Sequence, residues 1–413
     1  MARKLPNIVY IHTHDTGRCV SPYGFKAETP NLEAFARNSI VFRNAHSAAP
    51  TCSPSRAALL TGQYPHQAGM LGLAHFGHSL KHPEQHLLFT LRDNGYTSVL
   101  AGMQHVAHNP SDVGYDRMLM SEETTPTVDT VCPAFETFAS EKPAEPFFAS
   151  VGFHETHRPF EEPTEADDPA LCQIPAPLPD TPETREDAAA FAASLRRADE
   201  GIGRVLTALK DNGLYENTII IITTDHGPPF PEMKCNATVH GTGVMLMMRG
   251  PGIPSDSAAG NFHLQDALVS QVDVFPTLCE LTGIAKPDWL EGTSLLPLMR
   301  GEVSRVHDEI FAECTEHVGY EPVRAVRTND YVYIRRFSDP PAVDPRNCDD
   351  SPSKSLWLKE GWLDRPVPVE ELYHTRLDPQ ERRNLADVDH YASVKEDLRK
   401  RLGDWMERTG DVL

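Results

Sequence analysis

Two hydrophobic periodicities alternate along the first half of the chain. Apolar runs at 7–13 (NIVYIHT), 97–102 (TSVLAG), 146–154 (PFFASVGFH) and 218–227 (TIIIITTDHG) are typical of strands that are buried on both faces. Segments with helical spacing lie between them, the longest at 186–213. Buried strands separated by helices predict an α/β fold whose mostly parallel central sheet is covered by helices on both faces.

The pattern changes near residue 310. Short runs of alternating apolar and polar residues, such as VRAVRTNDYVYIRRF at 323–337, predict antiparallel strands, and an amphipathic helix is predicted at 390–410. We therefore predict two domains. The larger one covers residues 1–305, and a smaller α+β domain with an antiparallel sheet covers residues 306–413.

The predicted parallel sheet brings three polar clusters to one edge. HTHD, HETH and TTDHG each come at the end of an apolar run. Ligand sites in such sheets lie just beyond the carboxyl ends of the strands. The Pro-rich, acidic insert at 158–187 is predicted to be an irregular surface loop over the same edge, where it would help to shape a substrate cleft.

Composition and charge narrow the function classes. Acidic residues outnumber basic ones by 59 to 38, for a net charge of −21, and no basic run is interleaved with aromatics, so nucleic acid is not an expected partner. No apolar stretch approaches the roughly 18 residues that span a bilayer, and the N-terminal residues show no signal-like apolar segment. We therefore expect a cytoplasmic chain without a membrane partner. The eight cysteines are widely spaced, which favours neither a disulfide framework nor a zinc knuckle.

Two Asp and two His residues at strand ends form the first candidate site. His14 and Asp15 follow the first apolar run, and Asp225 and His226 come at the end of the most apolar one. Carboxylate oxygens suit Ca²⁺, Mg²⁺ or Mn²⁺, whereas two imidazoles shift the preference toward Mn²⁺ or Zn²⁺. A single Asp-His pair is more often a helix cap or a loop, but two pairs beside a hydrophobic sheet edge need a compensating charge. The pattern predicts a divalent metal site.

Histidines at strand ends form the second candidate site. His105 follows one apolar run, and His154, His157 and Arg158 follow another. A histidine that titrates near pH 7 can donate to an anionic substrate or move a proton to a leaving oxygen. The chain has 19 histidines, and most need no special role. Those expected at the surface or in packing positions include His75, His78, His82, His86 and His108.

Cys52 begins a predicted helix within AAPTCSPSRAALLTGQYPHQAG at 48–69. A phosphatase-type thiolate needs a loop of backbone amides with an arginine about six residues on, whereas Arg56 is only four residues on and Pro54 removes an amide donor. A cysteine protease would need an oriented histidine and would leave the metal pairs without a role. A buried structural cysteine is the remaining simple interpretation.

CSPSRAALLTG resembles the signature of the type I sulfatases, Cys-x-Pro-Ser-Arg followed by Leu-Thr-Gly, in which the cysteine is oxidised after translation to Cα-formylglycine. The segments at 29–47, 223–234 and 370–387 are also similar to segments of that family, so the resemblance covers nearly the whole chain. Within the family, FHETHR, LPDTPETRED and DHGPPFP are most similar to the heparan N-sulfatase (sulfamidase) branch.

The resemblance implies an alkaline-phosphatase-like fold and a metal-bound formylglycine. In that family the hydrated aldehyde attacks sulfur, the alcohol or amine leaves, and elimination of sulfate restores the aldehyde. The expected activity is hydrolysis of a sulfate ester or sulfamate on a small sulfated substrate, most simply a saccharide. A formylglycine-generating enzyme is an implied partner. One divalent ion is implied, Ca²⁺ first, with Mn²⁺, Mg²⁺ or Zn²⁺ as alternatives.

The resemblance also assigns roles to individual residues. Concentrated positive charge among them would offset the net charge of −21, which repels an anionic substrate. The resemblance implies the catalytic residues Cys52, Arg56, His105, His154 and Lys234 and the metal ligands Asp15, Cys52, Asp225 and His226. We also predict His14 as a metal ligand and His157, Arg158 and Gln104 as substrate-binding residues.

The chain departs from the family pattern in two places. The first strand ends in His14 and Asp15 where the family usually has Asp-Asp, so a neutral ligand replaces an anionic one. GMQH at 102–105 stands where the family usually has Gly-Lys-x-His, so Met103 replaces a cation that contacts sulfate. Such a loss costs on the order of 2 to 4 kcal/mol of transition-state stabilisation unless Arg158 or another histidine compensates.

These departures keep two other functions open. Formylglycine enzymes of the same superfamily include phosphonate monoester hydrolases and phosphodiesterases, which act on phosphorus. A non-catalytic carbohydrate-binding relic is the second alternative, although it would have no use for Cys52. Whether the chain forms homo-oligomers is also open.

Overall fold

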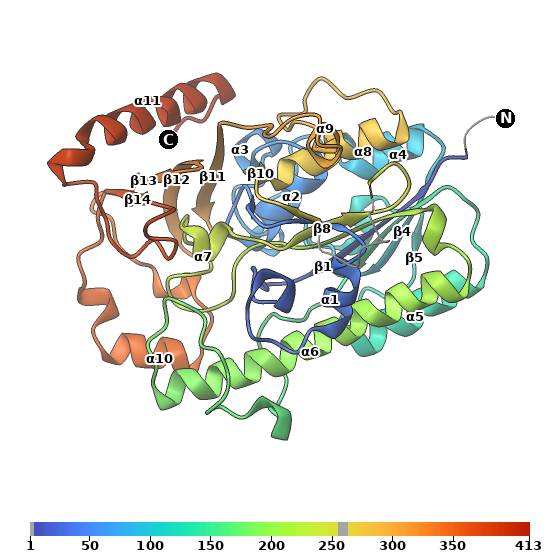
Figure 1. Ribbon diagram of the computed structural model, residues 1–413, viewed down its shortest axis with the longest axis horizontal. Coiled ribbons are helices and arrows are strands. Elements are labelled where there is room, and N and C mark those ends of the chain that lie inside the picture. Colours follow the sequence, from blue (N-terminus) through green and yellow to red (C-terminus); the bar gives the residue numbers. More distant parts are fainter. Residues whose placement is uncertain (1–3, 255–262) are drawn as a thin grey trace.

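The computed structural model describes residues 4–254 and 263–413 and contains two large β-sheets (Figure 1). The larger sheet has eight strands in the order β5-β4-β6-β1-β7-β8-β2-β9. Only the β7–β8 and β2–β8 pairs are antiparallel, so the sheet is mostly parallel, as predicted. The strands are β1 Asn7–Thr13, β2 Ile40–Phe42, β4 Thr97–Gly102, β5 Arg117–Met118, β6 Phe147–Gly152, β7 Thr218–Thr224, β8 Leu246–Arg249 and β9 His263–Gln265.

Helices cover both faces of this sheet, and the alternation of side chains along β1 shows how. Val9 and Ile11 pack in one hydrophobic cluster with α1, α5 and α6, whereas Ile8 and Tyr10 pack in a second cluster with α2, α4, α8 and α9. Successive residues of a strand point to opposite faces, so a strand buried on both sides is apolar throughout. The helices are α1 Pro30–Ala36, α2 Cys52–Thr61, α4 Leu87–Asp93, α5 Val128–Ser140, α6 Pro182–Asp211, α8 Val274–Thr282 and α9 Leu296–Met299.

The insert at 158–187 is only partly irregular, so that prediction was wrong at its C-terminal end. Helix α6 begins at Pro182, and a short 3-10 turn covers Glu165–Asp167. Pro182 occupies the first helical position, where its missing N–H costs nothing. Thr181 caps the helix by accepting a hydrogen bond from the amide of Thr184. The helix therefore begins within a Pro-rich stretch whose sequence predicts a loop.

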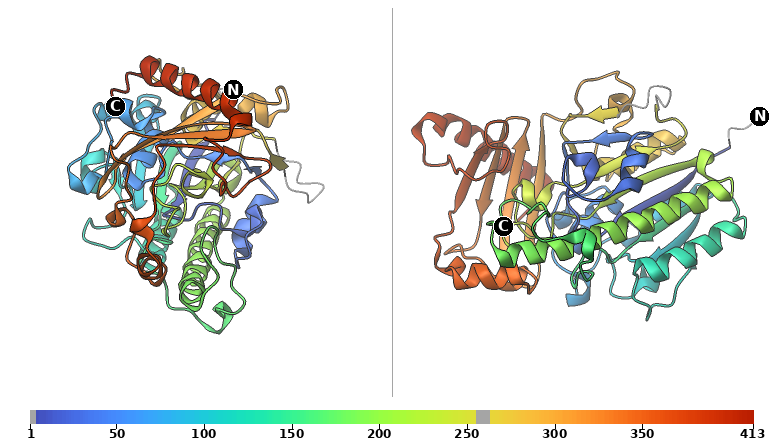
Figure 2. Two further views of the ribbon diagram at one scale, coloured as in Figure 1. Left: turned by 90° about the vertical axis from the view of Figure 1, so that its left-hand side faces the viewer. Right: turned by 60° about the horizontal axis from the view of Figure 1, so that its bottom comes forward.

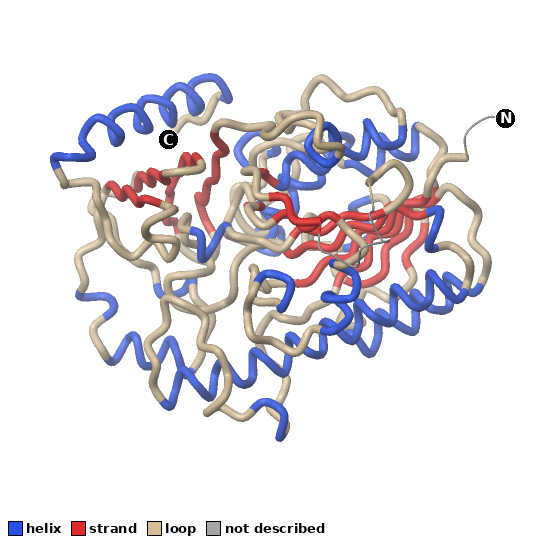
Figure 3. The backbone as a smooth tube through the Cα atoms, viewed as in Figure 1, coloured by secondary structure: helices blue, strands red, loops and turns tan. Residues whose placement is uncertain are grey.

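A second, antiparallel sheet of four strands follows in the order β11-β12-β13-β14, as predicted. It lies beside the main sheet, and Figure 3 shows the strands of the two sheets as separate groups. The terminal helix α11 packs on it through Leu398, Leu402 and Trp405, and the Trp405 ring stacks on Phe311 with centroids 4.8 Å apart. The elements are β11 Glu309–Glu316, β12 Tyr320–Thr328, β13 Tyr331–Arg336, β14 Glu370–His374, α10 Pro352–Lys359 and α11 Ala392–Thr409.

The second sheet packs against the part of the chain that contains α2. Ala48, Ala58 and Tyr64 belong to the same hydrophobic cluster as Phe311 and Trp405. The second sheet, coloured orange to red, lies next to the segment that includes α2 in both views of Figure 2. The predicted boundary at 305/306 stays a prediction, because the two parts share this core.

Four short elements complete the strands and α-helices of the described residues, which also contain several 3-10 turns. None of the helices in the described residues is long and apolar enough to cross a membrane. The remaining elements are β3 Ala45–His46, β10 Val269–Ser270, α3 Pro65–Ala68 and α7 Val239–Thr242.

Gly152 on β6 provides a test of how closely the strands approach at the site edge. A Cβ at this position would lie 2.3 Å from the Met103 carbonyl oxygen and 2.3 Å from a ring carbon of His12. We expect Gly152→Ala to lower the free energy of unfolding by about 1–3 kcal/mol, because neither neighbour has room to move. Gly403→Ala on α11, where nothing lies within 4 Å, should raise it by about 0.5–1 kcal/mol. Denaturant titration measures both, and an unchanged midpoint for Gly152→Ala would contradict the packing.

Candidate functional site

The carboxyl ends of β1 and β7 place four predicted ligands side by side. The strands are parallel neighbours, and their last residues, Thr13 and Thr224, are paired in register. His14 and Asp15 leave β1 at the same edge where Asp225 and His226 leave β7. The sequence therefore places these side chains together through strand register alone.

Cys52 joins these four residues as the first residue of α2. Its sulfur lies 3.1 Å from Nε2 of His14 and 3.3 Å from Nε2 of His226. All five side chains are buried, and their potential ligand atoms lie within 4.8 Å of one another. We call this group the ligand cluster: His14, Asp15, Cys52, Asp225 and His226.

Asp225 is at the centre of the cluster. Its Oδ1 accepts hydrogen bonds from the backbone amides of Asp15 and His226, at 2.8 and 2.9 Å. Its Oδ2 lies 3.2 Å from Nε2 of His14 and 3.0 Å from the guanidinium of Arg56. Asp15 adopts a left-handed backbone conformation with φ of 58°, which turns its amide toward Asp225.

Two buried cations contact different carboxylates of the ligand cluster. Arg56 is 1% exposed and donates to Asp225, to the carbonyl oxygen of Thr13 and to Nδ1 of His12. The ammonium of Lys234 lies 2.9 Å from Oδ2 of Asp15. Each carboxylate of the cluster therefore has one cationic partner, which offsets the cost of burying its charge.

Burial and charge shift the pKa values of these groups in opposite directions. Burial raises the pKa of the Cys52 thiol well above its ordinary value, so the thiol is protonated at neutral pH. Burial also disfavours the ionised Asp225, but the charges of His226 and Arg56 outweigh it and hold the pKa of that carboxyl below its ordinary value. For Lys234 burial is outweighed mainly by Asp15, so its pKa is raised and the ammonium persists.

The ligand cluster can hold a divalent metal ion. Two carboxylates and two imidazoles form a donor set that several divalent cations accept. Nδ1 of His14 and Oδ1 of Asp15 are buried without a hydrogen-bond partner in the described structure. A buried polar atom without a partner is costly, and a bound cation would supply one to Asp15.

The three predicted histidines surround the imidazole of His14. The ring centroids of His157, His105 and His154 lie 4.5, 5.6 and 6.2 Å from its centroid. His157 also approaches Lys234, with 3.4 Å between Nε2 and Nζ. The structure thus brings His105, His154 and His157 to the ligand cluster. His75, expected at the surface, stacks on His105 with 5.5 Å between centroids and extends this group outward.

Two residues predicted at the substrate have partners inside the protein instead. The guanidinium of Arg158 forms two hydrogen bonds with the carboxylate of Asp187 and lies over the rings of Phe160 and Phe230. The side chain of Gln104 closes its own loop, since it accepts from the amides at 106 and 107 and donates to the carbonyl at 107. This geometry gives both side chains a structural role, and neither takes the place of the family lysine.

Three residues at the site escaped the sequence interpretation. Nδ1 of His12 lies 2.5 Å from the guanidinium of Arg56, and burial and Arg56 both lower the His12 pKa, so the neutral ring accepts this hydrogen bond. His317 contacts the hydroxyl of Thr51, and Asp349 lies 3.1 Å from the ammonium of Lys234. Only His12 left a sequence signal, as the first residue of the HTHD cluster that ends the first apolar run. His317 and Asp349 come from segments far along the chain.

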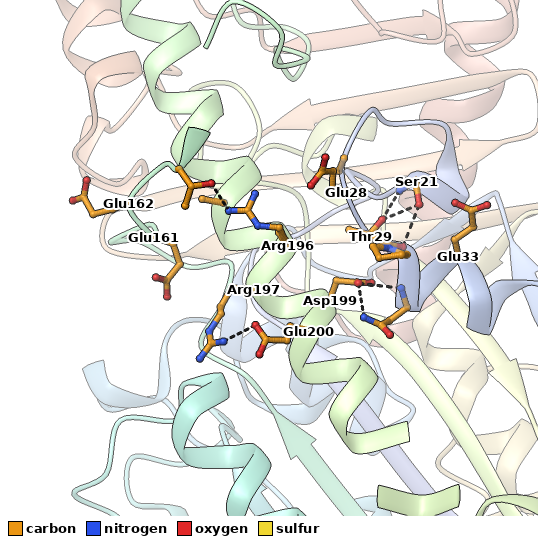
Figure 4. A pocket seen from close by; sticks show the side chains of 15 residues that line it. Ser21, Glu28, Thr29, Glu33, Glu161, Glu162, Arg196, Arg197, Asp199 and Glu200 are labelled. Carbon is orange, nitrogen blue, oxygen red and sulfur yellow. Dashed lines mark hydrogen bonds and ion pairs between the residues drawn. The ribbon is translucent and has the colours of Figure 1, made fainter. Parts of the chain in front are cut away.

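A separate pocket lies between α1 and α6 (Figure 4). Some of its charged groups already have partners. Arg197 lies 2.6 Å from Glu200, and Asp199 accepts from the amides of Asn31 and Leu32. None of the predicted site residues, all of which the structure describes, lines this pocket. The chemistry of the ligand cluster therefore does not extend to it.

Known proteins resemble this chain in sequence and in fold. Human N-sulphoglucosamine sulphohydrolase is 29% identical over 93% of this chain and 86% of its own length. A solved structure in complex with its substrate D-glucosamine-2-N,6-O-disulfate is 19% identical, with a TM-score of 0.76 and 99% of each chain covered. The phosphonate monoester hydrolase of Silicibacter pomeroyi has a TM-score of 0.75 at 19% identity, covering 98% of this chain and 96% of its own. The fold alone therefore does not distinguish sulfur from phosphorus chemistry.

Family comparison is more specific than the fold. Residues 244–353 match the family described as N-sulphoglucosamine sulphohydrolase, C-terminal. Residues 6–284 match the family described as Sulfatase, and this range contains the whole ligand cluster with Arg56 and Lys234. The chain therefore belongs to the sulfatase family.

Proposed function

We propose that this protein is a formylglycine-dependent sulfatase that hydrolyses sulfate ester or sulfamate groups on a sulfated saccharide. The observation that carries the proposal is the position of Cys52, whose sulfur lies within 3.3 Å of two imidazoles in a buried ligand cluster flanked by two cations. The saccharide follows from the relatives, of which one is a human N-sulphoglucosamine sulphohydrolase.

An unmodified Cys52 is poorly suited to this position. A thiol reacts as its thiolate, and burial raises the pKa of Cys52 well above its ordinary value. The cluster nevertheless directs two imidazoles and two carboxylates toward the sulfur. Conversion of the thiol to an aldehyde resolves this contradiction, because a hydrated aldehyde offers an oxygen nucleophile at the same Cβ and eliminates sulfate without a separate hydrolysis step.

The residues that would hold the metal are His14, Asp15, Asp225 and His226, together with the modified Cys52. The ion, with Ca²⁺ as the first candidate and Mn²⁺, Mg²⁺ and Zn²⁺ as alternatives, would supply Lewis-acid stabilisation of negative charge. Two carboxylates favour Ca²⁺, whereas His14 in place of a carboxylate moves the donor set toward Mn²⁺ or Zn²⁺.

The other residues bind and orient the anionic group. Arg56 and Lys234 pair with different carboxylates of the cluster, where buried positive charge would stabilise charge that develops on sulfate oxygens and on the leaving atom. Burial lowers the pKa of His105 and His154, so their neutral rings can each donate one N–H or accept one proton. His12 holds Arg56 in place from behind the site.

Conversion of Cys52 is tested by mass spectrometry of the peptide containing residues 48–69. In cells that have a formylglycine-generating enzyme, we expect a loss of about 18 Da relative to the cysteine peptide. Cys52→Ala should lower sulfate release from N-sulfated and O-sulfated glucosamine by roughly 10³-fold or more. Cys279→Ala, which removes a buried thiol of α8, is the matched control and should retain activity. Sulfate release by protein in which Cys52 is entirely unmodified would refute the proposal.

Metal binding is tested without measuring turnover. After treatment with a chelator, addition of the preferred ion at about 100 times its Kd should stabilise the protein by about 2.7 kcal/mol and raise Tm by about 2 °C or more. Asp15→Asn should remove most of this rise, since it replaces a ligand oxygen. Asp266→Asn, an exposed acid paired with Arg43, is the control. If none of Ca²⁺, Mn²⁺, Mg²⁺ and Zn²⁺ changes Tm, the ligand cluster is not a metal site.

A further inference from the structure

One carboxylate at the site comes from the C-terminal part of the chain. Asp349 lies between a 3-10 turn at Pro345–Asn347 and helix α10. Its Oδ2 lies 3.1 Å from the ammonium of Lys234. One of its carboxylate oxygens also lies within 4.8 Å of a carboxylate oxygen of Asp15 and of a ring nitrogen of His157. Lys234 is therefore held between a carboxylate of the ligand cluster and a carboxylate from outside it.

The loop that carries Asp349 is fixed on both sides. Before it, Oδ1 of Asn347 accepts hydrogen bonds from the amides of Val318 and Gly319. After it, Ser351 caps α10, and the ammonium of Lys354 donates to the carbonyl oxygen of Cys348 at 2.7 Å. These contacts keep the carboxylate at a fixed place beside Lys234.

Asp349 differs from Asp15 in its exposure. The Asp15 side chain is fully buried, whereas that of Asp349 is 25% exposed. Among the described residues, the side chain of Asp349 forms its only hydrogen bond or ion pair through Oδ2 to Lys234, so Oδ1 keeps its acceptor capacity. Asp349 is thus a partly exposed carboxylate with an unused acceptor oxygen, whereas the unpartnered Oδ1 of Asp15 is buried in the ligand cluster.

A carboxylate in this position works against sulfate binding. It neutralises part of the charge of Lys234 and repels any anion that approaches that cation. Asp15, His157 and Asp349 do not form a second metal site here, because the ammonium of Lys234 already lies between two of them. The carboxylate gains a favourable role if the substrate brings a hydrogen-bond donor to it.

We propose that Asp349 recognises the leaving group by accepting a hydrogen bond from an N–H or O–H that lies next to the scissile bond. The inference rests on the proposed function and deepens it, since it names the substrate class. Sulfated sugars with an amine or hydroxyl beside the sulfate fit this site. Aryl sulfates, whose leaving group has no such donor, leave Oδ1 of Asp349 unpaired and repelled by the anion.

The kinetic test compares the wild type with Asp349→Asn on two substrates, N-sulfated glucosamine and 4-nitrophenyl sulfate. The amide keeps the side-chain shape and an oxygen for Lys234, but it presents an NH₂ group to the substrate donor. We expect kcat/KM for the sugar to fall about 10- to 100-fold while that for the aryl sulfate stays equal or rises. Asp350→Asn is the matched control, because Asp350 is an exposed neighbour that pairs with Lys354.

A binding test separates this inference from the proposed function. In a Cys52→Ala background, which needs no formylglycine, calorimetry with free glucosamine and with inorganic sulfate measures each half of the product. Asp349→Asn should weaken glucosamine binding about tenfold or more and leave sulfate binding equal or tighter.

Three results would be decisive. Equal losses on both substrates, or unchanged glucosamine affinity, would overturn the role of Asp349 and reduce it to a support for Lys234. If converted wild-type protein turns over neither substrate, the proposed function is refuted. The glucosamine titration would still test the role of Asp349.

Discussion

The buried carboxylate of Asp225 is the group on which the site depends. One of its oxygens accepts hydrogen bonds from two backbone amides, one in the turn after β1 and one in the turn after β7, and so fixes the conformation of both turns. The other oxygen faces Arg56 and His14. A charge buried at a sheet edge without such partners would be too costly, so the backbone, the cation and the imidazole must take these positions together. The orientation of Cys52 follows, because Arg56 lies about one turn further along the same helix.

The net charge of the chain does not describe the local charges at the site. The chain carries a net charge of −21, yet its site contains two buried cations that are surrounded by histidines. Burial keeps His12, His14 and His105 neutral by lowering their pKa values, so the imidazoles do not add to the charge. Asp15 and Asp225 pair with these cations and Asp349 adds a third carboxylate, so a bound divalent cation would supply the positive charge that attracts an anion to the site.

The two sheets contribute differently to the site. The parallel sheet supplies the ligand cluster, because parallel strands end at one edge. The C-terminal part supplies His317, directly after β11, and Asp349, from a loop that is fixed by the hydrogen bonds of Asn347. The two parts share a hydrophobic cluster that contains Tyr64, Phe311 and Trp405, and this cluster fixes their relative position.

The sequence by itself determined the features that depend on short-range patterns. Apolar runs predicted the parallel strands, strand ends predicted the convergence of His14, Asp15, Asp225 and His226, and the residues around Cys52 predicted the family. These predictions are possible because residues that follow neighbouring parallel strands lie at the same edge of the sheet.

Only the tertiary structure decided which polar side chains remain available to a substrate. Arg158 and Gln104 are suitable residue types at suitable places, but Asp187 and the backbone of the 104–107 loop already bind them. Asp349 had no motif, since its role comes from a contact with Lys234 across 115 positions of sequence. Such contacts depend on how separate elements pack, and no local periodicity encodes that packing.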